Sequence, residues 1–258
     1  MASLITHLLV GKHVFQHIHN IEHSAKNYSA FLLGCLLVDV NRFSIIDKSQ
    51  THFVKRKKEN SKKYSSYSCE NFLSQLDKEL LRPWETLSKE EQVFIAGYLC
   101  HLAADEIWKE FGWQQVRTLK MSALPEFPVT GTVMLTAYDM LCKKEFTDFD
   151  SVTQALNQVS IPDVLVNISH DSLLKMWEII RSHIIYGSTP DSYIQLLALS
   201  GETEAELEKT RKEHDLYWEI AITIIREAGG VNKYIQTAIK RAVDVLPLLF
   251  QSDTLPKN

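Results

Sequence analysis

Residues 94–111 have the sequence FIAGYLCHLAADEIWKEF, in which two polar side chains interrupt an apolar helical pattern. His101 and Asp105 lie four residues apart, and a helix of 3.6 residues per turn places such residues on one face. Burying an imidazole and a carboxylate among apolar side chains is unfavourable unless hydrogen bonds or a metal ion compensate them. The pair is typical either of a local hydrogen bond or of two metal ligands, so other candidate ligands must decide between the two.

The composition indicates a globular protein. The chain has 258 residues, of which 45% are hydrophobic, and this is enough for a substantial core. A net charge of -4 argues against a dedicated nucleic-acid binder, which usually carries a basic face, although a local basic patch stays open. The four cysteines form no CxxC pair, which argues against a zinc knuckle or a disulfide framework and suits a reducing compartment.

The amino-terminal segment has none of the features of a secretory signal, and we expect it to be part of the fold. No apolar run reaches the roughly 18 to 20 residues that are needed to span a bilayer. We therefore expect a soluble, cytoplasmic protein. Its oligomeric state is left open by the sequence.

Helical periodicity is the main secondary-structure signal. Ser88 and Glu91 form a capping-box pattern that begins the helix around His101. Residues 40–50 are predicted to form a loop. The predicted helices cover residues 4–19, 29–39, 69–81, 89–112, 129–143, 150–158, 171–186, 190–199, 203–227 and 231–249.

These elements predict an all-α fold, a single-domain multi-helix bundle. The domain is expected to cover residues 1–258, with the core motifs in 1–113 and a helical C-terminal part in 128–250. The polar stretch at 145–160 is where a boundary to a second subdomain would lie.

Three further residues are candidate ligands because each occurs in an apolar or turn setting. They are His7 in an early helix, Asp39 at the end of the second helix, and His52 after the following loop. Together with His101 and Asp105 they offer three imidazoles and two carboxylates, which suit zinc, with iron and manganese as alternatives. Five protein ligands are too many for one tetrahedral ion with an open position, so two ions that share a carboxylate are the natural arrangement.

The order of four strings is more specific than any one of them. The strings are THLLV at 6–10, FLLGCLLVD at 31–39, DKSQTHF at 47–53 and GYLCHLAADEIW at 97–108. In this order they resemble the zinc-dependent phospholipase C and S1/P1 nuclease superfamily, and most closely its short bacterial members of mostly unassigned activity. The resemblance covers roughly the first 110 residues.

The resemblance implies an all-α fold with zinc ions held between helices. Asp39, His52, His101 and Asp105 would bind one ion, and Asp105 would bridge to a second ion that also takes His7. Asp39 would double as the base that orients the attacking water. Two such ions activate water and clamp the oxygens of a phosphoester, so the implied activity is metal-dependent phosphoester hydrolysis.

The chain also departs from the family pattern. Secreted members begin with a tryptophan whose amino group and carbonyl bind metal, whereas six residues precede His7 here. They also carry later histidines that bind a third ion, and this chain has no histidine between Asp105 and His170. We therefore expect one or two ions, and Asp139 and His214 are tentative sources of a further ligand.

Several alternatives stay open. The basic run at 55–58 either attracts an anionic substrate or forms a solvated loop. The substrate is a phospholipid, a nucleotide or another small phosphoester, and a cytoplasmic setting favours a soluble one. Other metal chemistry on the same scaffold, such as non-haem iron oxidation, is the first alternative function. A helical binding protein with a residual structural metal site is the second.

Overall fold

The computed structural model describes residues 4–19, 21–42, 46–54, 68–123, 131–157, 160–186 and 189–250. Within these ranges the chain forms eleven α-helices and two short 3-10 helices, and the only β pairing is one isolated bridge. The predicted all-α fold is therefore confirmed. The elements are α1 (Leu4–Phe15), α2 (Ala25–Leu37), η1 (Val38–Arg42), α3 (Lys48–His52), α4 (Ser68–Glu79), η2 (Trp84–Thr86), α5 (Lys89–Ser122), α6 (Thr132–Lys144), α7 (Phe149–Leu156), α8 (His170–Tyr186), α9 (Pro190–Leu199), α10 (Glu204–Glu227) and α11 (Gly230–Phe250).

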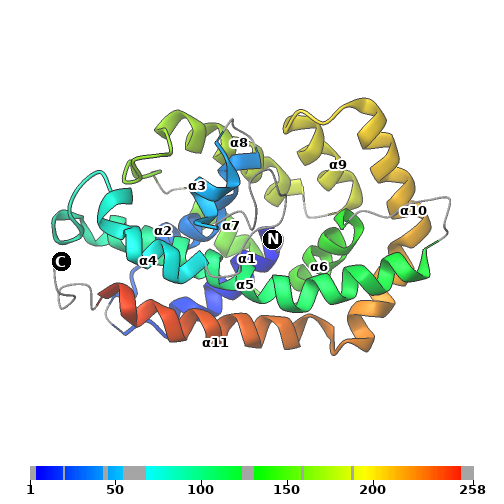
Figure 1. Cartoon of the computed structure of the whole chain (residues 1–258), viewed down its shortest axis with the longest axis horizontal. Helices are drawn as coiled ribbons and strands as arrows, with labels where there is room; N and C mark the ends of the chain where they lie inside the picture. The colour runs from blue at the N-terminus through cyan, green and yellow to red at the C-terminus, as the bar shows by residue number, and fades with distance from the viewer. Residues whose placement is uncertain are drawn as a thin grey trace.

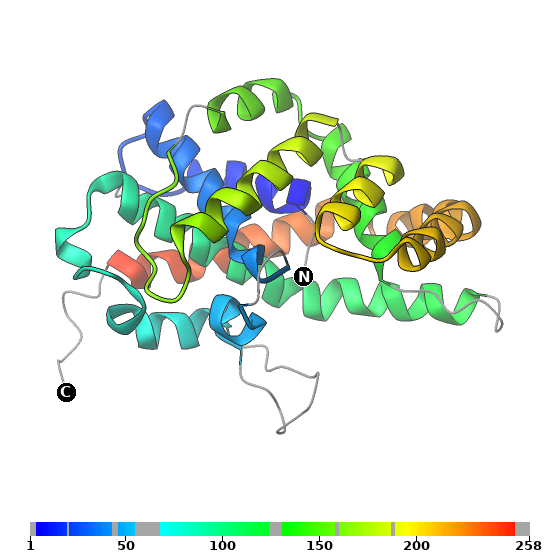
Figure 2. The ribbon, with the colours of Figure 1, turned by 90° about the horizontal axis from the view of Figure 1, so that it is seen from above.

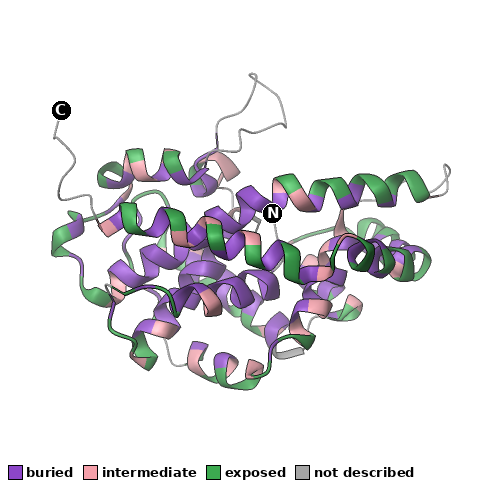
Figure 3. Ribbon diagram, turned by 90° about the horizontal axis from the view of Figure 1, so that it is seen from below, coloured by how far each residue is buried: buried purple, intermediate pink, exposed green. Residues whose placement is uncertain are grey.

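Helix α5 runs through the centre of the helical bundle. It runs from the end where α4 lies to the end where α10 lies, with α11 antiparallel beside it (Figures 1 and 2). Helices α1, α2, α4 and α11 all pack against α5. The central helices are therefore largely buried, whereas the last turns of α5 are exposed on most of their surface (Figure 3).

The crossing of α2 and α5 is unusually close because a glycine lies on each helix at the contact. A Cβ atom at Gly97 would lie 2.0 Å from the carbonyl oxygen of Phe31, and one at Gly34 would lie 2.1 Å from the carbonyl oxygen of Phe94. The two backbones touch here, and no larger residue fits without moving a helix. This contact fixes the end of α2, and with it η1, next to the middle of α5.

The predicted start of α5 is confirmed, but its predicted end near Gly112 is wrong. Ser88 and Glu91 form the expected capping box. The helix continues to Ser122 because Val116 and Leu119 are buried and supply packing beyond the glycine. Gly112 lies under the indole ring of Trp108, where a Cβ atom would come within 2.4 Å of the ring. Packing thus outweighs the cost of about 1 kcal/mol that glycine adds inside a helix.

The prediction of a loop over 40–50 is also wrong in part. The 3-10 helix η1 extends to Arg42, and α3 begins after Asp47. Asp47 and Gln50 form a capping box, a pattern that could have been recognised in the sequence. Helix α1 ends at Phe15 rather than at residue 19, since the backbone N–H groups of His17 and Ile18 bond to carbonyl oxygens three residues back, as in β-turns.

The buried core cluster extends from α1 to α11, and on this ground we propose that the chain is a single domain. None of the described helices combines the length and the apolar character needed to cross a membrane. The basic run at 55–58 lies outside the described residues.

A buried carboxylate on α5 links three helices. Glu106 accepts hydrogen bonds from the Ser68 hydroxyl at 3.1 Å, the Cys69 backbone N–H at 2.9 Å and the Arg241 Nε at 2.9 Å. Its side chain therefore joins the start of α4 and the middle of α11 to α5. The backbone N–H of Cys69 lies in the first turn of α4, where a carboxylate is favourable for the helix dipole.

We expect Glu106→Ala to lower the free energy of unfolding by about 2 kcal/mol, because the variant leaves two buried donors without an acceptor. Glu106→Gln should cost less, since its amide oxygen still accepts from Cys69. Urea unfolding of both variants checks this. Equal stability of Glu106→Ala and the wild type would show that the three-helix link contributes nothing.

Candidate metal centre

The five residues expected from the sequence converge on one place between helices. His7 comes from α1, Asp39 from η1, His52 from the end of α3, and His101 and Asp105 from α5. None of them is more than 1% exposed. The ligand atoms of His7, His101 and Asp105 all lie within 4.8 Å of one another. The same holds for the ligand atoms of Asp39, His52 and His101. The fold thus joins segments that are almost a hundred positions apart in the sequence.

The short helix α3 presents His52 to this cluster. Asp47 caps its first turn, and Phe53 ends it in the left-handed region at φ 51°. The Phe53 ring then packs against Phe72 on α4, with the ring centroids 4.8 Å apart. His52 is therefore held between a capped start and an anchored end.

The Asp105 carboxylate lies between two histidines. Its Oδ1 atom is 3.6 Å from His7 Nε2, and its Oδ2 atom is 3.5 Å from His52 Nε2. Asp39 Oδ1 lies 3.1 Å from the same His52 nitrogen. Two ligand atoms on a tetrahedral zinc ion, with bonds of about 2.0 to 2.1 Å, are about 3.3 Å apart. The spacing of these atoms is thus the spacing found around such an ion.

Several buried nitrogens in the cluster have no hydrogen-bond partner in the described part of the chain. They are both ring nitrogens of His7 and the Nε2 atoms of His52 and His101. The rings of His7 and His101 also stack in parallel, with centroids 3.7 Å apart and an interplanar angle of 8°. Buried polar atoms are normally hydrogen-bonded, so this donor set of imidazole nitrogens and carboxylate oxygens fits a divalent cation.

The backbone of α2 orients one of these rings. His101 Nδ1 lies 2.7 Å from the carbonyl oxygen of Cys35. A carbonyl oxygen is only an acceptor, so Nδ1 carries the proton and Nε2 keeps its lone pair. Because Cys35 follows Gly34, the close contact between α2 and α5 brings this carbonyl to the ring.

Burial and neighbouring charges shift the pKa values of His52, His101 and Asp105. Burial lowers the pKa of His52 to about 4, with a smaller contribution from the charge of Lys48. Burial and the nearby His7 hold the pKa of His101 well below its usual value. Burial alone would raise the pKa of Asp105, but nearby positive charges, the contact with His7 and the charge of Lys48 hold it well below its usual value. Neutral imidazoles and ionised carboxylates are the forms that bind metal.

The two tentative ligands belong to neither ligand set. Asp139 Oδ1 accepts hydrogen bonds from the Thr6 backbone N–H at 3.0 Å and from the Thr6 hydroxyl at 3.3 Å. This carboxylate therefore supports the first turn of α1, directly before His7. Both ring nitrogens of His214 are engaged within the protein, by the Thr210 carbonyl at 2.8 Å and the Thr136 hydroxyl at 3.0 Å.

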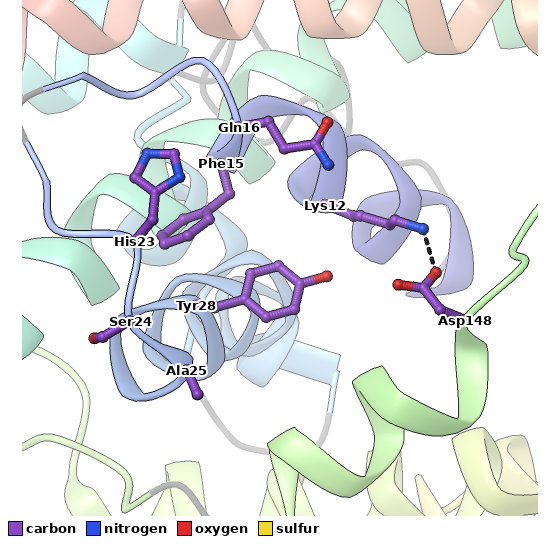
Figure 4. A pocket seen from close by; sticks show the side chains of 8 residues that line it. All are labelled: Lys12, Phe15, Gln16, His23, Ser24, Ala25, Tyr28 and Asp148. Atoms are coloured by element: carbon purple, nitrogen blue, oxygen red, sulfur yellow. Dashed lines mark hydrogen bonds and ion pairs between the residues drawn. The ribbon is translucent and has the colours of Figure 1, made fainter.

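A separate pocket of about 340 Å³ lies between the end of α1, the start of α2 and the start of α7 (Figure 4). Lys12 forms an ion pair with Asp148 at its edge, and Tyr28 and His23 also line it. None of the five residues of the cluster lines this pocket.

The comparisons with known proteins agree with the chemistry of the cluster. Residues 6–108 match the family model described as zinc dependent phospholipase C. The matched segment covers less than half of the 258 residues but contains all five residues of the cluster. It confirms the resemblance to zinc-dependent phospholipase C, whereas the link to S1/P1 nucleases is not tested by it. No curated protein and no solved structure matches the chain.

Proposed function

We propose that this chain is a metal-dependent phosphoester hydrolase that holds one or two zinc ions with His7, Asp39, His52, His101 and Asp105. The observation that carries the proposal is the position of the Asp105 carboxylate, whose two oxygens face different histidines. The match of residues 6–108 to zinc dependent phospholipase C supports the same reaction class.

The ligand assignment is the one that the resemblance implies, and the valence of each group is consistent with it. Each neutral imidazole offers one lone pair, whereas a carboxylate can give one oxygen to each of two ions. Asp105 is therefore the bridging ligand in a two-ion site, even though His101 belongs to both sets of nearby atoms. One ion would be held by Asp39, His52, His101 and Asp105, and a second would be held by Asp105 and His7.

When bound, zinc supplies Lewis acidity and lowers the pKa of water to about 7. The protein holds the ligands in place: the Cys35 carbonyl fixes the His101 ring, and the first turn of α1 is supported by Asp139. Asp39 would accept a hydrogen bond from the attacking water and orient it towards the phosphorus, which is the role that the resemblance implies for it. Because the cluster is buried, these interactions act in a low dielectric and are stronger than in water.

The substrate in this proposal is a phosphoester, with a phospholipid as the class that the matching family names. A soluble phosphoester in a cytoplasmic setting is the form we favour.

Purified protein from zinc-replete medium should contain at least one zinc ion per chain and should hydrolyse an aryl phosphodiester. A chelator should remove activity and lower the melting temperature, because a ligand at a thousand times its Kd stabilises the folded state by about 4 kcal/mol. Elemental analysis and thermal unfolding check both effects. His214→Ala is the matched control, since it removes a buried histidine outside the cluster and should keep its zinc. Less than about one ion per chain would contradict the proposal.

The same samples separate the alternatives. Bound iron that colours the protein, together with no hydrolysis by the zinc-loaded protein, would favour oxidative metal chemistry, to which the same ligands are suited. Strong stabilisation by zinc without turnover of any phosphodiester would favour a binding protein with a structural ion.

A further inference from the structure

The two ring nitrogens of His52 face different surroundings. Nε2 faces the carboxylate oxygens of Asp39 at 3.1 Å and Asp105 at 3.5 Å. Nδ1 lies 2.8 Å from the Thr51 hydroxyl oxygen. The ring is 1% exposed, so water does not decide its tautomer. The ring proton has two possible positions: Nε2, where Asp39 accepts it, or Nδ1, beside the Thr51 hydroxyl.

The remaining neighbours of the Thr51 hydroxyl are acceptors. Its oxygen lies 3.2 Å from Asn41 Oδ1 and 3.5 Å from the Lys48 carbonyl oxygen. A hydroxyl has one hydrogen to donate. When a metal occupies Nε2 and the ring proton lies on Nδ1, these two oxygens are the atoms that take it. The hydroxyl oxygen then accepts the Nδ1–H of His52, and the lone pair stays on Nε2.

The surrounding structure holds this arrangement in place. Thr51 is fully buried, and the Tyr98 hydroxyl on α5 donates to its carbonyl oxygen. Asn41 lies two residues after Asp39 in η1. The short helix η1 therefore influences both ring nitrogens of His52. Its Asp39 lies at Nε2, and its Asn41 contacts the Thr51 hydroxyl, which lies at Nδ1.

We propose that Thr51 is a positioning residue that fixes His52 as the Nδ1–H tautomer and thereby directs the Nε2 lone pair to the metal. The proposal rests on the proposed function, because it assumes that Nε2 is a metal ligand. It adds to the five ligands a residue that touches none of the reacting atoms.

The first experiment measures zinc affinity by competition with a chromophoric chelator. Thr51→Val keeps the shape of the side chain and removes the hydroxyl, and it should weaken zinc binding by about 10- to 100-fold, as loss of a ligand's hydrogen-bond partner typically does. Thr51→Ser restores the hydroxyl and should bind zinc like the wild type.

The second experiment reads the tautomer directly and needs no metal. Long-range proton–nitrogen NMR of the metal-free protein should show the His52 proton on Nδ1 in the wild type and in Thr51→Ser. In Thr51→Val the proton should move to Nε2, where Asp39 accepts it. Thr51→Ala serves the same purpose should the valine variant fail to fold.

Thr136→Val is the matched control. Its hydroxyl is also buried and contacts a histidine nitrogen, that of His214, outside the cluster. It should change stability without changing zinc affinity.

The outcomes distinguish the two proposals. Wild-type zinc affinity and an unchanged His52 tautomer in Thr51→Val would overturn the role of Thr51 and leave the proposed function standing. A wild-type protein that binds no zinc would overturn the proposed function. An equal loss of affinity in Thr51→Val and Thr136→Val would show that the effect is structural only.

Discussion

Asp105→Ala should remove zinc binding and hydrolysis together. The substitution deletes the oxygens that face His7 at 3.6 Å and His52 at 3.5 Å, so both sides of the cluster lose their common ligand. The loss of activity should exceed the roughly 100- to 1,000-fold that follows removal of a single transition-state hydrogen bond. Zinc should no longer raise the melting temperature of the variant. Phosphodiester hydrolysis, zinc content and thermal unfolding measure these effects.

Glu106→Gln is the matched control for Asp105. It changes the neighbouring buried carboxylate on the same helix, whose oxygens bind Ser68, Cys69 and Arg241 instead of facing the cluster. The control should lose some stability and keep its zinc. If Asp105→Ala still hydrolyses the substrate, Asp105 does not bridge, and an ion held by Asp39, His52 and His101 would have to carry the reaction.

The five residues were selected by the order of the four strings that contain them, because a polar side chain in an apolar helix is not specific: His183 and His214 are buried as well. Burying His101 and Asp105 is costly without a partner, and this cost is visible in the sequence. The partners that orient the rings were not recognised. The group that orients His101 is the backbone carbonyl of Cys35, and no side-chain pattern encodes it. Thr51 stands directly before His52, but its role depends on Asn41, which only the fold brings near.

Helix boundaries were predictable where a cap defines them and unpredictable where tertiary packing does. The capping box of Ser88 marked the start of α5, and that of Asp47 would have marked α3. Gly112 misled the prediction because a glycine usually weakens a helix, whereas here it makes room for the Trp108 ring. The space beside a glycine cannot be deduced from the sequence, and the same limit applies to the crossing of α2 and α5.

Gly97→Ala tests that crossing and should be strongly destabilising. The new methyl group would lie 2.0 Å from the Phe31 carbonyl oxygen and 3.1 Å from the Cys35 nitrogen. These are backbone atoms in a helix, so the strain is relieved only when α2 moves as a whole. Overpacking of a core costs about 1 to 3 kcal/mol, and a backbone clash belongs at the upper end, near 3 kcal/mol. Urea unfolding measures the loss.

The same displacement should weaken zinc binding, because α2 carries the Cys35 carbonyl that orients His101 and leads directly to Asp39. Gly131→Ala is the control, since its nearest neighbours, on Val116, lie 3.9 Å away in ordinary contact. A Gly97→Ala protein with wild-type stability would show that the helices are not in backbone contact in solution. Lost stability with unchanged zinc affinity would show instead that the cluster holds its geometry independently of the crossing. Loss of both stability and zinc affinity would mean that the close contact of α2 and α5 at Gly97 sets the position of the ligands.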